Sequence, residues 1–121
     1  MKDCLIVDDS PIVRRAAREL LTGLGFSCRE AVDGEKALQS CAEAMPDVLL
    51  LDWNMPVMDG ITCLRNLRAT PAAAGTKVII CTTHAELAQI EEALAAGADE
   101  YIMKPFDRDM LEGKFRQVGV L

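Results

Sequence analysis

Short apolar runs alternate with segments of helical periodicity along the whole chain. Three runs are apolar throughout, which is typical of strands buried on both faces of a parallel sheet: Cys4–Val7, Val48–Leu51 and Val78–Cys81. Two further runs, Ser27–Ala31 and Glu100–Met103, mix polar and apolar residues, as strands at a sheet edge do. The pattern therefore predicts five strands, three of them central.

The segments between these runs predict helices. Ser10 and Pro11 are typical of a helix start, and Gly25 is typical of the end of the same helix. Apolar residues at helical spacing mark this helix and three later ones: Ile12, Val13, Ala16, Ala17, Leu20, Leu21 and Leu24; Ile61, Leu64 and Leu67; Leu87, Ile90 and Leu94; Met110, Leu111 and Phe115. Another helix runs from Asp33–Gly34 to near Ala44, and Pro71 and Gly75 indicate a loop.

Strands that alternate with helices predict an α/β fold whose parallel sheet is covered on both faces. With the first, third and fourth strands inside, the order is 2-1-3-4-5, a doubly wound, flavodoxin-like sheet. The sheet and its helices account for all 121 residues, so we expect a single domain, residues 1–121, with no output domain.

Composition narrows the function classes. No apolar run reaches the roughly 20 residues of a membrane span, and the N-terminus does not resemble a secretory signal. A net charge of −6 argues against non-specific nucleic-acid binding, so we interpret Arg14, Arg15 and Arg18 as a solvated helix face. The five scattered cysteines are typical of small core residues in a reducing compartment, which predicts a cytoplasmic protein. His84 has no Cys or His partner at zinc-ligand spacing.

Polar residues follow four of the predicted strands. Asp8 and Asp9 follow the first strand, Asp52 the third, Thr82 the fourth and Lys104 the fifth. Each alone is explained as a turn, cap or solvated residue. Together they occupy the carboxyl ends of the strands, where an open α/β sheet binds ligands. Three neighbouring carboxylates repel one another unless a cation is present, and Mg²⁺ prefers such oxygen ligands.

Four stretches resemble the response-regulator receiver family, in particular its stand-alone CheY-like members. They are Ile6–Ser10 (IVDDS), Leu51–Gly60 (LDWNMPVMDG), the strand end at Thr82 and Gly97–Phe106 (GADEYIMKPF). This resemblance covers essentially the whole chain. It implies a single-domain response regulator of a two-component phosphorelay that changes its partner binding when phosphorylated, and not an enzyme with a separate substrate.

The resemblance also implies roles for single residues. Asp52 would accept a phosphoryl group from a histidine kinase or a histidine phosphotransferase. Mg²⁺, with Mn²⁺ as the alternative ion, would be held by Asp9 directly, by Asp8 largely through water, by Asp52 and by the backbone carbonyl of Asn54. Thr82 would bond the phosphoryl oxygens and, as a switch residue, move on activation.

The remaining implied roles lie at and after the fifth strand. Lys104 would pair with the aspartate and then with the phosphate, and its peptide bond to Pro105 would be cis. Tyr101 would be an aromatic rotamer switch. Thr83, where many relatives carry alanine, would narrow access to the site, and His84 lies where the family tunes its own dephosphorylation.

Partners follow from the same resemblance. The target would bind the face built from the fourth helix, the fifth strand and the fifth helix, with a flagellar motor switch and a kinase as candidates. A phosphate sink and a relay intermediate are alternatives. We expect a monomer, with a transient dimer left open, and neither a nucleic acid nor a membrane as partner.

Three other functions fit this fold class less well. A flavodoxin-type electron carrier would need a hydroxyl- and glycine-rich loop, and Asp8–Pro11 would instead repel a flavin phosphate. A phosphatase of the haloacid dehalogenase type would need an acid where Asn54 stands. A pseudo-receiver, which acts as an unphosphorylated binding module, usually lacks one of the acids or the lysine, and here all are intact.

Overall fold

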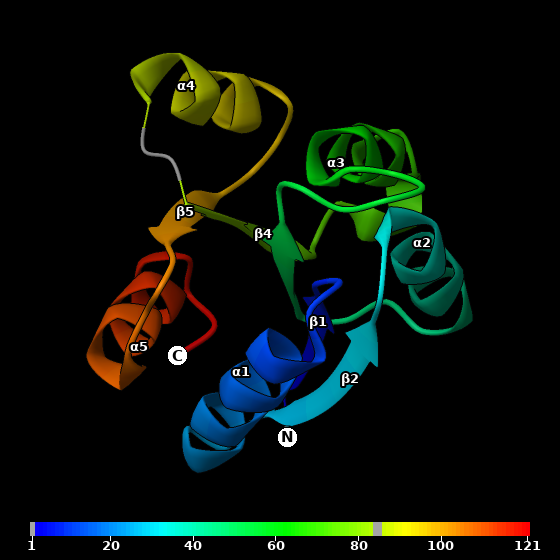
Figure 1. Cartoon of the computed structure of the whole chain (residues 1–121). Helices are drawn as coiled ribbons and strands as arrows, with labels where there is room; N and C mark the ends of the chain where they lie inside the picture. The colour runs from blue at the N-terminus through cyan, green and yellow to red at the C-terminus, as the bar shows by residue number, and fades with distance from the viewer. Residues whose placement is uncertain (1, 84–85) are drawn as a thin grey trace.

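The computed structural model describes residues 2–83 and 86–121, and it contains the predicted parallel sheet in the order β2-β1-β3-β4-β5 (Figure 1). Every predicted strand is confirmed, with ends within one residue of the prediction. The strands are β1 (Asp3–Val7), β2 (Ser27–Ala31), β3 (Val48–Asp52), β4 (Lys77–Thr82) and β5 (Glu100–Met103). The uniformly apolar runs are the three central strands because only those are covered by helices on both faces and flanked by strands on both sides.

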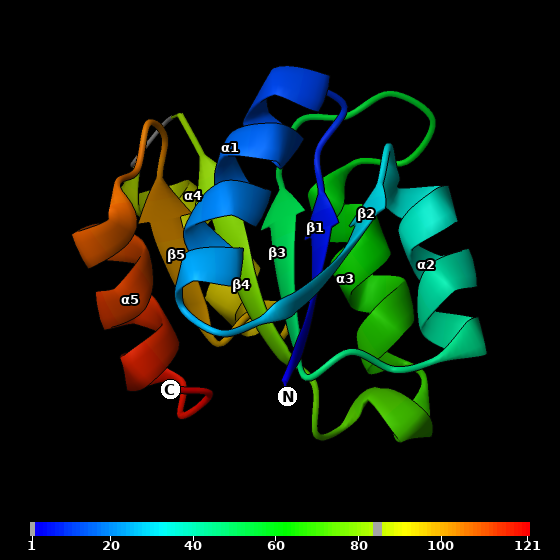
Figure 2. The same ribbon diagram turned by 90° about the horizontal axis from the view of Figure 1, so that it is seen from below.

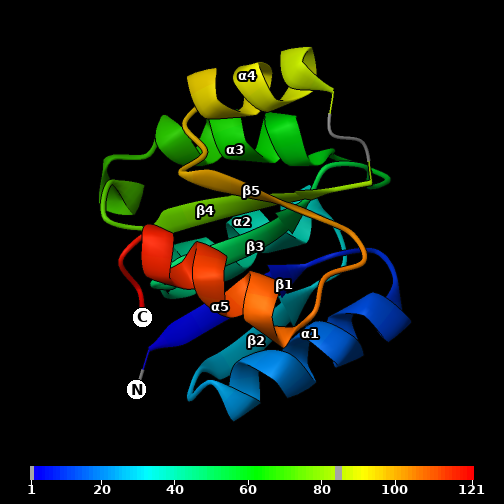
Figure 3. The same cartoon turned by 90° about the vertical axis from the view of Figure 1, so that its left-hand side faces the viewer.

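Helices cover both faces of the sheet (Figure 3). One face carries α1 (Pro11–Gly23) and α5 (Arg108–Gln117), and the other carries α2 (Gly34–Glu43), α3 (Gly60–Arg68) and α4 (Leu87–Ala95). Successive strand residues point to opposite faces, so the strands contribute to two separate cores. In the α1 and α5 core, the rings of Phe26 and Phe115 meet edge to face at 5.1 Å.

Four helices begin with a side chain that accepts a backbone N–H. Ser10 caps α1, as predicted, and three aspartates cap α2, α3 and α5: Asp33, Asp59 and Asp107. These three acids therefore have a structural role, which separates them from the aspartates that follow β1 and β3. Gly97 ends α4 with a φ of 113°, in the left-handed region that glycine tolerates.

The structure differs from the sequence-based expectation in several places, among them the apolar stripe of α4, where Leu87 is 70% and Leu94 is 45% exposed. The predicted loop near Pro71 contains a short 3-10 helix, η1 (Pro71–Ala73), because proline suits the first position of a helical turn. Ile12 belongs to the apolar stripe of α1 but is 80% exposed. It lies in the first turn of α1, which extends past the strand ends, so the sheet does not cover it (Figure 2).

Most of the cysteines lie in the core, as predicted. All five thiols are unbridged, and four of them, Cys4, Cys41, Cys63 and Cys81, are buried. Burial raises the pKa of Cys63 to about 12, which suits a core residue and not a nucleophile. Within the described ranges, no helix combines the length and the apolar character that crossing a membrane requires.

Candidate functional site

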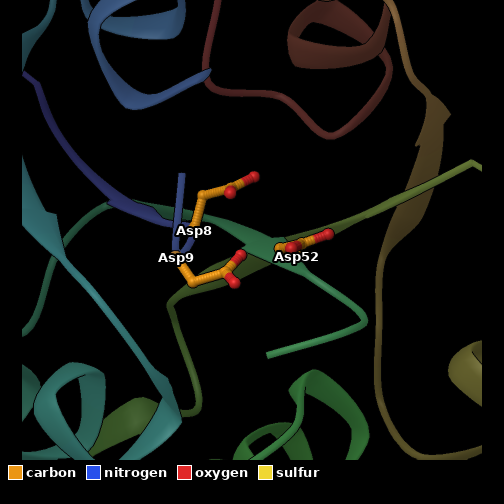
Figure 4. Close-up of side chains that lie close together, drawn as sticks. All are labelled: Asp8, Asp9 and Asp52. Carbon is orange, nitrogen blue, oxygen red and sulfur yellow. The ribbon is translucent and has the colours of Figure 1, made fainter. Parts of the chain in front are cut away.

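Three aspartates gather at the carboxyl end of the sheet. Asp8 and Asp9 lie in the loop after β1, and Asp52 is the last residue of β3 (Figure 4). Because β1 and β3 are parallel neighbours with Val7 opposite Leu51, the residues that follow, Asp8 and Asp52, lie at the same level of the sheet. Each aspartate places one carboxylate oxygen within 4.8 Å of the other two. The sequence-based expectation of a shared acidic crevice therefore agrees with the geometry.

Lys104 joins two of these acids. Its ammonium lies 2.6 Å from Asp8 Oδ2 and 2.9 Å from Asp52 Oδ1. The resemblance implied the contact of Lys104 with Asp52, whereas its contact with Asp8 was not expected. The Lys104–Pro105 peptide bond is cis, as the resemblance implies.

Burial and the contact between Asp52 and Lys104 shift the pKa of each residue in opposite directions. Burial raises the pKa of Asp52; the hydrogen bond from Lys104 opposes this shift and the charge of Asp8 adds to it, and the net direction is upward. For Lys104, burial lowers the pKa, but the bonds to Asp8 and Asp52 outweigh it and the net direction is again upward. Lys104 is therefore held as an ammonium, while burial makes ionisation of Asp52 less favourable than it is in water.

Four hydrogen bonds fix the position of Asp8. Its backbone N–H donates to the Ala31 carbonyl at 3.2 Å, and its Oδ1 accepts the Ser10 N–H at 2.9 Å. Its Oδ2 accepts from Lys104, and its backbone carbonyl accepts from the Arg14 guanidinium at 2.7 Å. The interpretation of Arg14 as part of a solvated face is thus wrong, because only 15% of its side chain is exposed. Arg15 is exposed, as predicted.

The loop after Asp52 is closed by backbone contacts. The Gly60 N–H donates to the Trp53 carbonyl at 2.9 Å, and the Gly34 N–H donates to the Met58 carbonyl at 3.2 Å. A Cβ at Gly60 would collide with the Asp52 carbonyl, so glycine is required where α3 starts against the acid. Asn54 lies in this loop and is exposed. Its carbonyl as a metal ligand stays a prediction.

Thr82 ends β4 beside the acids. It is buried, and its carbonyl accepts the Lys104 N–H at 2.9 Å, which fixes the two strand ends together. Thr83 lines an apolar cavity of about 280 Å³ between α1 and the segment that follows β5, together with Lys104 and Phe106. The narrowing of access to Asp52 by Thr83 stays a prediction. His84 lies outside the described residues.

Tyr101 lies on β5, at the edge of the sheet and away from the acids. Its ring is half-buried, and the Lys114 ammonium stands 4.4 Å from the ring centroid. Lys114 also lies 3.2 Å from Glu100. The aromatic ring therefore contacts α5, one element of the predicted output face.

The donor set suits a divalent metal ion of the Mg²⁺ or Mn²⁺ class. All three side chains offer hard carboxylate oxygens, and Asp8 and Asp52 are less than a tenth exposed. Their mutual repulsion is only partly offset by Lys104, so a cation would lower the energy of the cluster. The residues present fit such an ion.

Comparisons with known proteins agree with the fold and the site. The family described as the response regulator receiver domain matches residues 4–116. The chemotaxis protein CheY of Pseudomonas aeruginosa is 41% identical over 115 residues, which cover 94% of this chain and 93% of that protein.

Two solved structures share the whole architecture. The chemotaxis response regulator CheY4 of Vibrio cholerae has a TM-score of 0.93 at 31% identity and covers 98% of both chains. CheY of Borrelia burgdorferi, in a complex with CheX, BeF3 and Mg²⁺, has a TM-score of 0.91 at 32% identity, over 99% of this chain and 90% of that one.

Proposed function

This chain belongs to the response regulator receiver family, and from that premise we propose that it accepts a phosphoryl group on Asp52 in an Mg²⁺-dependent reaction. The donor would be a histidine kinase or a histidine phosphotransferase. The observation that carries the proposal is the convergence of three carboxylates and Lys104 at the carboxyl end of the sheet.

Asp52 is the nucleophile in this reaction. One carboxylate oxygen forms a bond to the phosphorus of the donor's phosphohistidine while the phosphorus–nitrogen bond breaks. The imidazole nitrogen keeps the electron pair of that bond and takes a proton from water. The carboxylate must be ionised to attack, and the Lys104 ammonium, 2.9 Å away, favours the ionised form against the effect of burial.

The neighbouring groups supply positioning and charge. Lys104 neutralises negative charge on the oxygens of the transferred group, and the Thr82 hydroxyl bonds one of them. Asp8, Asp9, Asp52 and the Asn54 carbonyl would hold Mg²⁺, with Mn²⁺ as the alternative ion. When bound, the ion neutralises the acids and the charge that develops on the phosphoryl oxygens.

The signal leaves through a binding surface. Thr82 ends β4, which precedes α4, and Lys104 follows β5, which precedes α5. New bonds from both residues to a phosphoryl group would therefore favour one arrangement of the α4-β5-α5 face. Tyr101 is the two-state element of this face. We propose a cytoplasmic, monomeric, single-domain regulator whose target binds there, with chemotaxis among the pathways it serves. The 41% identity to a chemotaxis protein supports this assignment.

Labelling with a small phosphodonor tests the acceptor. Acetyl phosphate with Mg²⁺ or Mn²⁺ should add one phosphate to the wild type, seen by intact mass, and none in EDTA or on Asp52→Asn. Asp107→Asn is the matched control, since it removes one carboxylate at a helix cap where Asn serves as well as Asp. Equal labelling of Asp52→Asn would overturn the proposal.

A further inference from the structure

Arg14 makes a contact that its place in a basic helix face does not explain. One guanidinium nitrogen donates to the Asp8 carbonyl at 2.7 Å, and Nε lies 3.0 Å from Glu30 Oε1. The Asp8 carbonyl belongs to the peptide unit that joins Asp8 to Asp9. Arg14 thus holds the short connection between two of the three clustered acids, although it contacts none of their carboxylates.

Glu30 in turn holds Arg14. It follows Arg29 on the edge strand β2, and its second oxygen lies 2.7 Å from Arg18 Nε, one turn further along α1. Burial raises the pKa of Glu30, but the hydrogen bonds from Arg18 and Arg14 outweigh it and the pKa is lowered, so Glu30 stays ionised. The planar fork of Arg14 is thereby fixed between β2 and the loop after β1.

We propose that Arg14 is a positioning residue for the metal site: its guanidinium fixes the Asp8–Asp9 peptide unit so that the Asp9 carboxylate faces Asp52. The inference rests on the proposed Mg²⁺ site. Asp9 is exposed. The orientation of its backbone limits the positions that its carboxylate can reach. Removing a group that orients a metal ligand without touching the metal commonly lowers metal affinity 10–100-fold.

The direction in which Arg14→Ala changes Mg²⁺ affinity distinguishes a positioning role of Arg14 from a purely electrostatic one. Removing a cation near an acidic site strengthens the attraction for Mg²⁺, so a purely electrostatic role predicts tighter binding by Arg14→Ala. A purely structural role predicts lower stability with unchanged affinity. Positioning predicts weaker binding despite the lost positive charge.

Arg18 provides a matched control. It lies on the same helix, pairs with the same Glu30 and carries the same charge, but among the described residues its guanidinium donates to Glu30 alone. Arg14→Ala and Arg18→Ala therefore remove equal charge and one Glu30 ion pair each. They differ in the bond to the Asp8 carbonyl.

The experiment is a titration of each variant with MgCl₂, followed by the amide resonances of residues around the acids. We expect about tenfold weaker Mg²⁺ binding for Arg14→Ala, a change within twofold for Arg18→Ala, and partial recovery in Arg14→Lys. Before Mg²⁺ is added, the Asp9 amide nitrogen should shift more in Arg14→Ala than in Arg18→Ala, since its own peptide carbonyl loses a donor.

Unchanged or tighter binding by Arg14→Ala would overturn the inference while leaving the metal site intact. A wild type that does not bind Mg²⁺ would instead overturn the proposed function. If Arg14→Ala does not fold, Arg14→Lys is compared with Arg18→Lys, and equal affinities of these two would contradict the positioning role.

Discussion

The two ends of the sheet use similar side chains but balance their charges differently. At the amino end, Arg68 donates to the carbonyls of Gly97 and Ala73, both at 2.9 Å, and pairs with Asp99 at 2.9 Å. At the carboxyl end, Lys104 contacts Asp8 and Asp52 while Asp9 lies within reach of both. At the first end each arginine meets one carboxylate, Arg68 with Asp99 and Arg29 with Asp3, whereas one lysine meets a cluster of three at the second.

The charge balance at the amino end serves the stability of the fold, whereas the imbalance at the carboxyl end serves the proposed metal site. The amino end, where Figure 2 shows both chain termini, has charges and carbonyls that satisfy one another, which stabilises the fold. Among the described residues at the carboxyl end, three carboxylates meet one ammonium, and this excess of negative charge costs stability until a cation or a positively charged group arrives. The comparison predicts that Mg²⁺ changes the effect of substitutions at the carboxyl end and leaves the effect of substitutions at the amino end unchanged.

Removing Lys104 should have the largest effect. Lys104→Ala leaves Asp8 and Asp52, which are almost fully buried, without their ammonium, and should lower the free energy of unfolding by about 3 kcal/mol in EDTA. Mg²⁺ should recover part of this loss. Urea denaturation with and without Mg²⁺ measures both. Lys114→Ala, which breaks the more exposed pair with Glu100, should cost less than about 1 kcal/mol, and an equal loss in both variants would contradict the account.

Removing Arg68 tests the opposite end. Arg68→Ala leaves the Gly97 carbonyl without its side-chain donor, removes one of the two donors of the Ala73 carbonyl and of Asp99, and should cost about 2 kcal/mol. The same denaturation experiment should give equal losses in EDTA and in Mg²⁺, and labelling by acetyl phosphate should stay as in the wild type. A loss that Mg²⁺ repairs would show that the two ends are not independent.

Asp9→Asn should reverse its effect with the metal. In EDTA it relieves repulsion at an exposed position and should raise the free energy of unfolding by up to about 1 kcal/mol, the energy of two unit charges about 4 Å apart in water. In Mg²⁺ the variant should bind the ion more weakly than the wild type, so its higher free energy of unfolding should be lost. Thermal unfolding over a range of Mg²⁺ concentrations should show the two curves crossing. Parallel curves would remove Asp9 from the metal site.

The smallest effect concerns pH. The pKa of Asp52 is raised above its ordinary value of 3.8 in the folded state, so folding favours the protonated acid. Its contribution to stability is therefore present below pH 3.8 and is lost as the pH rises through the raised folded value. In EDTA, the free energy of unfolding of Asp52→Asn minus that of the wild type should grow over this window. A difference that shrinks would mean that Lys104 outweighs burial.

Topology could be predicted from the sequence because it follows from local patterns. The apolar runs fixed the strands, and the strand ends then brought Asp52 and Lys104 to one edge. The contacts that depend on particular side-chain conformations could not be predicted. Arg14 meets Glu30 across sixteen positions, and Lys104 meets Asp8 across ninety-six. Helical spacing alone assigned Arg14 to the solvent, since it carries no information about the neighbouring strand.

Mapping the phosphorylated residue tests the central claim most directly. The protein is incubated with acetyl phosphate and Mg²⁺, and borohydride then reduces the acyl phosphate to an alcohol, which converts a phosphorylated aspartate into homoserine. Tandem mass spectrometry of the peptides locates the change. The account predicts homoserine at position 52 and aspartate at positions 8 and 9, and homoserine at either of those positions, or at none of the three, would contradict it.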